Sequence, residues 1–167
     1  MFDETIHAKA RRVLEACRAA GVMLVTAESC TGGLVAGALT EIAGSSDVVD
    51  RGFVTYSYQA KTEMLGVPAD LIATRGAVSE PVARAMAEGA LARAAPKAQL
   101  SVAVTGVAGP GSDSQSKPAG LVHFAAAQTG KDVIHEMREF GDVGRDAVRL
   151  ATVAVALDLI LRRLAED

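Results

Sequence analysis

The segment Thr26–Gly33 constrains the fold of this chain more than any other part of the sequence. It reads Thr-Ala-Glu-Ser-Cys-Thr-Gly-Gly, follows the apolar run at 22–25 and precedes apolar residues at helical spacing. A strand that breaks into a glycine-rich turn and then a helix places hydroxyls and backbone N–H groups at a helix N-terminus. The partial positive charge there favours a phosphate or a developing oxyanion. Ser29 is therefore a candidate nucleophile or anion ligand, although simple helix capping by Ser29 and Thr31 would explain the same residues.

A second glycine-rich turn, at 105–111, follows the apolar run at 100–104 in the same way. Ligands of open α/β sheets bind where strand ends meet glycine-rich turns. We therefore expect the two turns to form one pocket. The polar stretch at 112–117 directly after the second turn is the best candidate for a mobile loop.

Helices and strands are predicted to alternate around these two turns. The apolar spacing predicts helices over about 5–20, 34–44, 61–65, 80–95 and 144–164, and strands over about 22–27, 53–56, 100–104, 121–128 and 132–140. Pro68 is expected to open a turn, and Thr129-Gly130-Lys131 indicates a hairpin between the last two strands. This order predicts a three-layer α/β/α fold with a mixed, mainly parallel sheet, in a single domain over 1–167.

Composition excludes several classes of protein. Half of the residues are hydrophobic and only 4% are aromatic, which favours the aliphatic core of an α/β domain. The net charge of −3, without a block of Lys or Arg, argues against direct nucleic-acid binding. No apolar run approaches the roughly 20 residues of a membrane span, and the N-terminus lacks the basic start of a signal peptide. Cys17 and Cys30 lie far apart without a ligand-like spacing, so neither a disulfide nor a zinc site is expected. We expect a cytoplasmic protein without a metal.

Lys61 is the best candidate for a general base. The three histidines fall inside a predicted helix (His7) and predicted strands (His123 and His135), so a Ser–His–Asp triad is disfavoured. Lys61 follows a strand end and lies in the first turn of a helix, where the helix dipole and burial lower the pKa of an amine. Tyr56, at the end of that strand, is placed to hydrogen-bond the same centre. A solvated surface lysine and an ordinary strand tyrosine are the alternatives.

Other polar residues extend this candidate site. Arg145 opens the last predicted helix, and a guanidinium offers a fork of donors to a phosphate or carboxylate, with a purely structural role as the alternative. Thr105 and Gly106 offer a hydroxyl and a closely approaching backbone N–H to the same ligand, although turn formation alone would explain the glycine. Cys30 is an alternative nucleophile to Ser29, and spacing does not separate the two.

Several separate motifs, in order and spacing, resemble the CinA C-terminal-domain family, the nicotinamide-nucleotide amidohydrolase group. The resemblance covers about residues 5–164, and Tyr58 departs from it because many relatives carry Asn there. The motifs are Ala27–Gly33, Gly44-Ser45-Ser46, Gly52–Ser57 with Lys61, Gly76–Glu80 and Thr105–Pro110.

This resemblance implies an enzyme that converts nicotinamide mononucleotide, a small pyridine nucleotide, and water into nicotinic acid mononucleotide and ammonia, with no cofactor. It implies Ser29 and Lys61 as the catalytic pair and Tyr56 as a supporting tyrosine. The expected substrate contacts are Cys30, Thr31, Gly32, Gly33, Ser46, Thr105, Gly106, Gly109 and Arg145. A non-catalytic module that binds a nucleotide or phosphate through the same turns is the competing hypothesis.

The final predicted helix is apolar around most of its circumference. A sheet covers only one side of a helix, so the remaining apolar surface needs another partner. We expect a homo-oligomer, most simply a two-fold symmetric dimer, because closed contacts between identical patches are the commonest solution. The alternative is that this helix lies centrally in the helical layer of the monomer.

Overall fold

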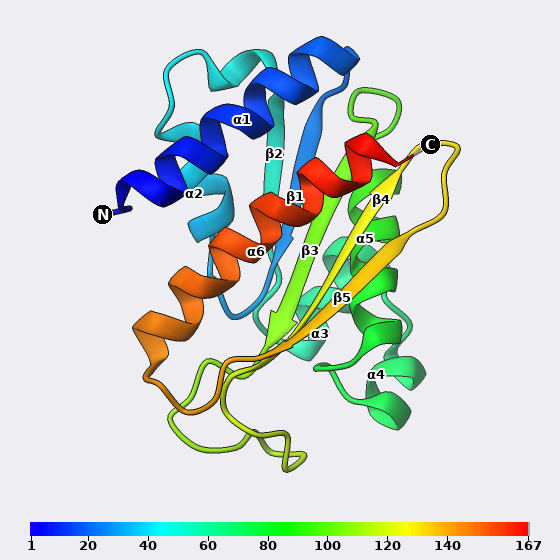
Figure 1. Cartoon of the computed structure of the whole chain (residues 1–167). Helices are drawn as coiled ribbons and strands as arrows, with labels where there is room; N and C mark the ends of the chain where they lie inside the picture. The colour runs from blue at the N-terminus through cyan, green and yellow to red at the C-terminus, as the bar shows by residue number, and fades with distance from the viewer. Residues whose placement is uncertain (167) are drawn as a thin grey trace.

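The computed structural model describes residues 1–166 and has one five-stranded sheet with helices on both faces (Figure 1). The strands are β1 (Leu24–Glu28), β2 (Val49–Val54), β3 (Leu100–Gly106), β4 (Leu121–Gln128) and β5 (Ile134–Glu139). The helices are α1 (Glu4–Ala20), α2 (Leu34–Thr40), α3 (Tyr58–Leu65), α4 (Ala69–Arg75), α5 (Glu80–Ala94) and α6 (Arg145–Ala165), with a short 3₁₀ helix η1 (Ser45–Asp47).

The sheet order is β2-β1-β3-β4-β5. β1 runs parallel to both β2 and β3, because helical crossovers connect these strands. The pairs β3–β4 and β4–β5 are antiparallel. The mixed, mainly parallel sheet is therefore confirmed: β4 runs opposite to the other four strands, and β5, antiparallel to β4, runs in the same direction as β1, β2 and β3.

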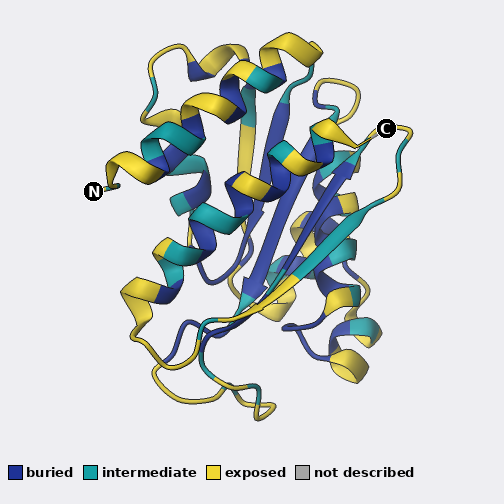
Figure 2. Cartoon of the chain, in the orientation of Figure 1, coloured by how far each residue is buried: buried dark blue, intermediate teal, exposed yellow. Residues whose placement is uncertain are grey.

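Two helical layers enclose the sheet (Figure 1). α1, α2 and α6 cover one face, and α3, α4 and α5 cover the other. Successive side chains of β3 alternate between the two cores: Val102 and Val104 face α6, whereas Ala103 faces α5. Figure 2 shows the central strands buried between these layers. The three-layer α/β/α architecture is thus confirmed.

Several elements differ from the sequence prediction, among them α3, which begins at Tyr58 rather than at residue 61, and α2, which ends at Thr40 rather than at about residue 44. The second strand begins at Val49 rather than at residue 53, because β2 is an edge strand and its exposed polar residues hide the usual apolar pattern. Thr55 lies past the end of β2, although its N–H still donates to the Glu28 carbonyl at 2.8 Å. The segment after Pro68 forms the short helix α4 rather than a turn.

The apolar surface of α6 is largely covered within the chain. α6 packs on β3 and β4 on one side and against α1 and α2 on others. Leu150 is its one large apolar residue that stands out as exposed among those described, at 37%. This arrangement matches the alternative in which the helix lies centrally in its layer, so a partner subunit is not needed to bury α6. No helix within residues 1–166 is long and apolar enough to cross a membrane.

Candidate active site

A cavity of about 280 Å³ lies at the carboxyl ends of β1 and β3. The turn after β1 and the loop at 106–113 after β3 both line it, so the two glycine-rich turns do meet as the sequence predicts. Tyr56, Lys61 and Arg145 also line the cavity, together with Ala77 and Val78. In Figure 1 this is the end of the molecule where the long loop between β3 and β4 projects.

Lys61 and Ser29 are joined by a hydrogen bond inside this cavity. Lys61 Nζ lies 3.0 Å from Ser29 Oγ, 2.7 Å from the Thr55 carbonyl oxygen and 3.4 Å from the Tyr56 carbonyl oxygen. Lys61 is only 1% exposed, since α3 carries its side chain inward beneath the 55–57 segment. The Ser29 N–H donates to the Val104 carbonyl, which fixes the nucleophile turn to β3.

Burial lowers the pKa of Lys61 to about 8. A minor fraction of neutral amine is therefore present near neutral pH, far more than an ordinary lysine with a pKa of 10.5 would have. In the neutral state, its two N–H groups remain available to the carbonyls of Thr55 and Tyr56. Its lone pair then accepts the hydrogen of the Ser29 hydroxyl, which is the arrangement that general-base activation of a serine requires.

Cys30 is a poor nucleophile in this environment. Its side chain is buried, and burial raises the pKa of the thiol to about 12. The thiolate, which is the reactive form, is therefore scarce near neutral pH. Of the two candidate nucleophiles that spacing left open, Ser29 is therefore the more reactive in this environment. Cys17 packs in the apolar stripe of α1, where burial raises its pKa to about 11.

The carboxylate of Glu28 occupies the N-terminus of α2. It accepts the N–H groups of Gly33, Val35 and Ala36 at 3.1, 3.0 and 2.8 Å and the hydroxyl of Thr31 at 2.6 Å. This corrects the expectation that the N-terminus of this helix is open to a substrate anion, because the chain's own carboxylate already fills it. It also removes the Gly33 N–H from the expected substrate contacts. Neither Ser29 nor Thr31 is the cap.

One N–H group of the nucleophile turn, that of Cys30, is free at the cavity wall within the described residues; Thr31 is fully buried and does not line the cavity. The Gly32 N–H donates to the Ser29 carbonyl, whereas those of Cys30 and Thr31 donate to no oxygen within residues 1–166. Arg149 of α6 holds the turn from outside: its Nε donates to the Cys30 carbonyl and its Nη2 to the Thr31 carbonyl, both at 3.1 Å. A donor in the position of the Cys30 N–H suits an oxyanion that forms on a group attacked by Ser29.

Arg145 links the two sides of the cavity rim. Its Nη1 donates to the Gly109 carbonyl and its Nη2 to the Tyr56 hydroxyl, both at 2.9 Å. The Tyr56 side chain is 61% exposed, and only its backbone carbonyl approaches Lys61. This corrects the expectation that the Tyr56 side chain hydrogen-bonds the Ser29–Lys61 centre. Arg145 remains directed at the cavity, as the sequence predicts.

Thr105 and Gly106 of the second glycine-rich turn both have structural roles, which the sequence alone did not distinguish from ligand binding. The Thr105 hydroxyl donates to the Ala77 carbonyl at 2.8 Å, so it is not a free donor for a ligand. A Cβ at Gly106 would lie 2.6 Å from Val122 Cγ2 and 2.8 Å from the Leu121 carbonyl oxygen. Close approach of β4 therefore explains this glycine, although both residues line the cavity.

Ser46 lies away from this site. It belongs to η1, which precedes β2, and β2 runs parallel to β1. Ser46 is therefore at the amino end of these strands, whereas Ser29 follows the carboxyl end of β1, and Ser46 does not line the cavity. This corrects the expectation that Ser46 belongs to the same site.

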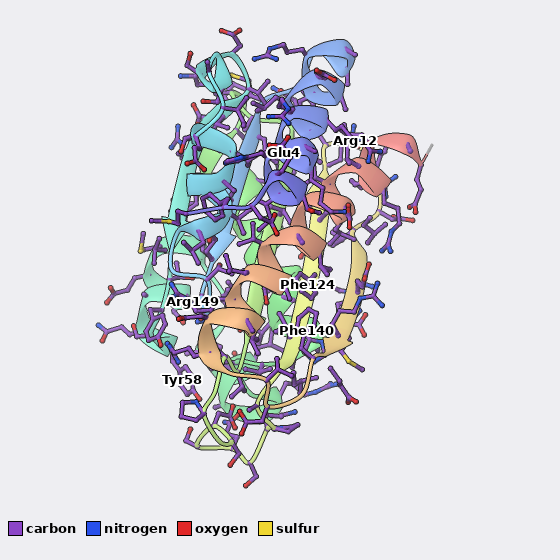
Figure 3. The ribbon with its side chains drawn as sticks, turned by 60° about the vertical axis from the view of Figure 1, so that its left-hand side comes forward. Glu4, Arg12, Tyr58, Phe124, Phe140 and Arg149 are labelled. Carbon is purple, nitrogen blue, oxygen red and sulfur yellow. The ribbon has the colours of Figure 1, made fainter. Side chains whose placement is uncertain are left out.

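Tyr58 lies at the cavity rim, on the same side of the molecule as Arg149 in the view of Figure 3. Its hydroxyl is 3.5 Å from Ser114 Oγ of the loop between β3 and β4. The side chain is 44% exposed. The residue at which this chain departs from many relatives is thus part of the cavity wall rather than of the Ser29–Lys61 contact.

The histidines lie outside the cavity, as expected. His123 Nδ1 and His135 Nε2 are 3.0 Å apart across β4 and β5, and burial lowers the pKa of His123 to about 4. His7 contacts Glu41 at 2.9 Å on the α1 side. Within the described residues, no group of three or more His, Cys, Asp or Glu side chains is arranged to hold a metal ion.

Glu28 and Arg149 are the polar residues that sequence reasoning missed. Glu28 adjoins Ser29 in the first motif, but an acid at the end of an apolar strand gives no sign that it turns back to cap the next helix. Arg149 carried a detectable signal, since it follows Arg145 by one helical turn and residues at that spacing share a helix face.

Fold and site together define a three-layer α/β/α protein with a buried serine–lysine pair at the carboxyl end of its sheet. The protein-family model of the CinA C-terminal domain matches residues 6–164 of this chain. The chain belongs to this family.

Relatives of known sequence and structure agree with this assignment. The nicotinamide-nucleotide amidohydrolase PncC of Escherichia coli is 44% identical over all of this chain and 99% of that protein. A CinA-like protein of Geobacter sulfurreducens is 46% identical over 97% of this chain, which spans only 38% of the longer relative. The crystal structure of the competence/damage-inducible protein CihA from Agrobacterium tumefaciens has a TM-score of 0.92 and 52% identity, with 99% of each chain covered.

Proposed function

We propose that this protein hydrolyses the carboxamide of nicotinamide mononucleotide to give nicotinic acid mononucleotide and ammonia. The observation that carries the proposal is the 3.0 Å contact between Ser29 Oγ and a buried Lys61 whose pKa is lowered to about 8. The 44% identity to a protein named nicotinamide-nucleotide amidohydrolase, over its whole length, supports this substrate class.

In the acylation step, Ser29 Oγ attacks the carboxamide carbon while Lys61 Nζ takes the hydroxyl proton. The positive charge of the pyridinium ring withdraws electrons from the carbonyl and favours this attack. Negative charge on the carbonyl oxygen is met by the N–H group of Cys30, which lines the cavity. Lys61 then returns the proton to the leaving nitrogen, the C–N bond breaks, and ammonia departs from the acyl-enzyme.

In the deacylation step, Lys61 takes a proton from water as the water oxygen attacks the acyl carbon. The C–O bond to Ser29 breaks, and Lys61 gives the proton back to Ser29 Oγ. Each half of the reaction therefore begins and ends with a neutral Lys61. The lowered pKa of Lys61 favours both halves, because each needs the neutral amine as its base.

Arg145 is the proposed site for the substrate phosphate. Its guanidinium is held at the cavity rim by the Gly109 carbonyl and the Tyr56 hydroxyl. These contacts fix the side chain in place, which reduces the entropy lost when a phosphate binds. Tyr56 then supports the reaction in two ways: its carbonyl accepts from Lys61, and its hydroxyl orients Arg145.

The direct test is turnover by the purified protein. We expect release of ammonia and formation of nicotinic acid mononucleotide in a 1:1 ratio, measured by coupled spectrophotometry and by NMR. The Ser29→Ala variant should fold and show no turnover above background. A folded wild-type protein that converts neither nicotinamide mononucleotide nor related pyridine amides would overturn the proposal.

The competing hypothesis is a non-catalytic module that binds a nucleotide or phosphate at Arg145 and the 106–111 loop. A buried lysine beside the Ser29 hydroxyl has no use in such a module. Calorimetric binding of nicotinamide mononucleotide without turnover, unchanged in the Lys61→Ala variant, would make the binding module the better account.

A further inference from the structure

The chain has two tyrosines and no tryptophan, and both tyrosines line the active-site cavity. Both side chains are exposed to solvent. An exposed aromatic ring lacks the stabilisation that burial gives to most aromatic side chains. Two exposed rings at the mouth of one cavity are therefore typical of a wall that a ligand covers.

Of the two rings, that of Tyr58 has the weaker contacts within the chain. The Tyr56 hydroxyl accepts a hydrogen bond from Arg145 Nη2 at 2.9 Å, which holds that side chain at the rim. The one hydrogen-bond contact of the Tyr58 hydroxyl within residues 1–166 is with Ser114 Oγ in the loop between β3 and β4, at 3.5 Å (Figure 3). This distance is too long for a strong hydrogen bond. Tyr58 is therefore available to a ligand.

The position of Tyr58 on α3 brings its ring close to the reacting groups. Tyr58 is the first residue of α3, and Lys61 follows it by one helical turn. Side chains at this spacing share a helix face, with Cβ atoms about 5–6 Å apart. Tyr58 also borders a second hollow, of about 400 Å³, between α3 and α4, so its ring separates that hollow from the cavity. A ring whose carboxamide reaches Ser29 therefore enters beside Tyr58.

The charges around the cavity leave a cationic ring without a free carboxylate. Asp113 is the one acidic side chain that lines the cavity within residues 1–166. Its Oδ1 accepts the N–H groups of Gln115 and Lys117 at 2.9 and 2.7 Å, so this carboxylate already stabilises its own loop. Arg145 adds positive charge. The electron-rich face of a tyrosine is the remaining kind of group that stabilises a cation.

We infer that Tyr58 is a specificity-determining residue, whose ring contacts the pyridinium ring of the substrate through a cation–π interaction and selects cationic carboxamides over neutral ones. This inference rests on the proposed amidohydrolase function. A cation on an aromatic face gains more when water is displaced from both, as at a wall that the ligand covers. Tyr58 thus acts on the charge of the ring, whereas Arg145 acts on the phosphate.

The first experiment compares a cationic ligand with a neutral ligand of the same shape. The ligands are nicotinamide mononucleotide and its benzamide counterpart, in which a ring carbon replaces the charged nitrogen. Calorimetry measures both in the Ser29→Ala background, so that no turnover occurs. Tyr58→Leu should weaken binding of the cation by about 5- to 20-fold and of the neutral ligand by less than about twofold. Tyr58→Phe keeps an aromatic face and should bind the cation within about threefold of the parent protein.

Met64→Leu is the matched control, because Met64 lies on the same helix, is exposed and does not line the cavity. It should change neither affinity. An equal loss for both ligands in Tyr58→Leu, or no loss for either, would overturn the inference. A loss of the preference for the cation in Asp113→Asn, with none in Tyr58→Leu, would assign the recognition to Asp113 instead. If Tyr58→Leu does not fold, Tyr58→Asn decides by the same criteria.

Tyrosine fluorescence gives a readout that needs neither turnover nor a phosphate. An electron-poor pyridinium ring quenches the emission of a phenol on which it stacks, and the chain has no tryptophan to mask this emission. The probe is nicotinamide methylated on its ring nitrogen, with benzamide as its neutral control. Saturable quenching by the probe should persist in Tyr56→Phe, which keeps Tyr58, and should be largely lost in Tyr58→Phe. Equal quenching in the two variants, or none in the wild type, would contradict the role of Tyr58.

The two proposals fail in different ways. A wild-type protein that does not turn over nicotinamide mononucleotide, but shows saturable quenching that depends on Tyr58, overturns the proposed function and supports the role of Tyr58. A wild-type protein that turns over the substrate, but whose Tyr58→Leu variant loses affinity equally for both ligands, retains the proposed function and overturns the role of Tyr58.

Discussion

Lys61 Nζ lies 3.0 Å from Ser29 Oγ, although the two residues are 32 positions apart in the sequence. β1 ends just before Ser29, and the parallel strand β2 ends shortly before the helix that carries Lys61. Parallel pairing therefore brings the two side chains to the same end of the sheet.

The rate of hydrolysis should rise with pH through about pH 8. The base must be neutral, and the pKa of Lys61 is lowered to about 8, so kcat/KM should increase about tenfold per pH unit below that value and level off above about pH 9. Initial rates between pH 6.5 and 9.5 check this. A profile that is flat across this range would show that Lys61 is not the titrating base.

The same lowered pKa should appear in stability. An ordinary lysine has a pKa of 10.5, so between about pH 8 and 10.5 the unfolded chain holds a proton that the folded chain has lost. The contribution of Lys61 to the free energy of unfolding therefore increases as pH rises through that window. The free energy of unfolding of wild type, measured against Lys61→Met, should rise from pH 8 to 10. Parallel curves for the two proteins would contradict the prediction.

Substitution should assign the nucleophile to Ser29. Ser29→Ala should lose activity by at least about 10³-fold because the acyl-enzyme has no oxygen to form on. Cys30→Ala should keep activity within about tenfold, since the thiol is buried with its pKa raised to about 12. Intact-protein mass spectrometry of a trapped acyl-enzyme gives a second readout. The reverse order of the two variants would move the chemistry to Cys30.

Glu28→Gln should destabilise the fold by about 1–3 kcal/mol. Both carboxylate oxygens accept backbone N–H groups, and an amide NH₂ in place of one oxygen leaves a buried donor facing another donor. Urea unfolding measures the change. Glu63→Gln is the matched control, because Glu63 lies on α3 and, within residues 1–166, its one hydrogen-bond partner is the Gln59 amide at the exposed surface. A similar loss in both variants would argue against a special role for the cap.

Arg145→Lys should weaken binding of the phosphorylated substrate more than it slows chemistry. A lysine cannot keep both the Gly109 and the Tyr56 contacts and still offer a fork to phosphate. KM for nicotinamide mononucleotide should rise about tenfold, whereas kcat/KM for the phosphate-free riboside should change little. An equal loss for both substrates would show that Arg145 does not act on the phosphate.

The homo-oligomer remains a separate expectation. Light scattering tests it by comparing the mass in solution with the subunit mass of 17.2 kDa.

Sequence patterns predicted the parts of the site that are local. Ser29, Cys30 and the glycines after them form one continuous turn, and the strand before it is apolar and buried, so their neighbourhood follows from short-range rules. Lys61 was predicted from its place in the first turn of a helix after a strand, and its burial agrees with that reasoning.

Contacts between distant elements were the parts that sequence could not predict. The Tyr56 side chain points to Arg145 rather than to Lys61, a choice that depends on how α6 packs against the sheet. Ser46 is 17 positions from Ser29 but lies at the other end of the strands, because β2 must run parallel to β1. The turn of Glu28 into the α2 N-terminus is a side-chain conformation that no periodicity records.

The internal cap at Glu28 also bears on how this fold can change its ligand. Because the helix N-terminus is already neutralised from within, attraction for an anionic substrate has to come from side chains such as Arg145, which stands on a different element from Ser29. Reaction and recognition are thus carried by separable pieces of the chain. Replacement of the rim residues can redirect the enzyme toward uncharged amides while the serine, its base and the turn around them stay intact.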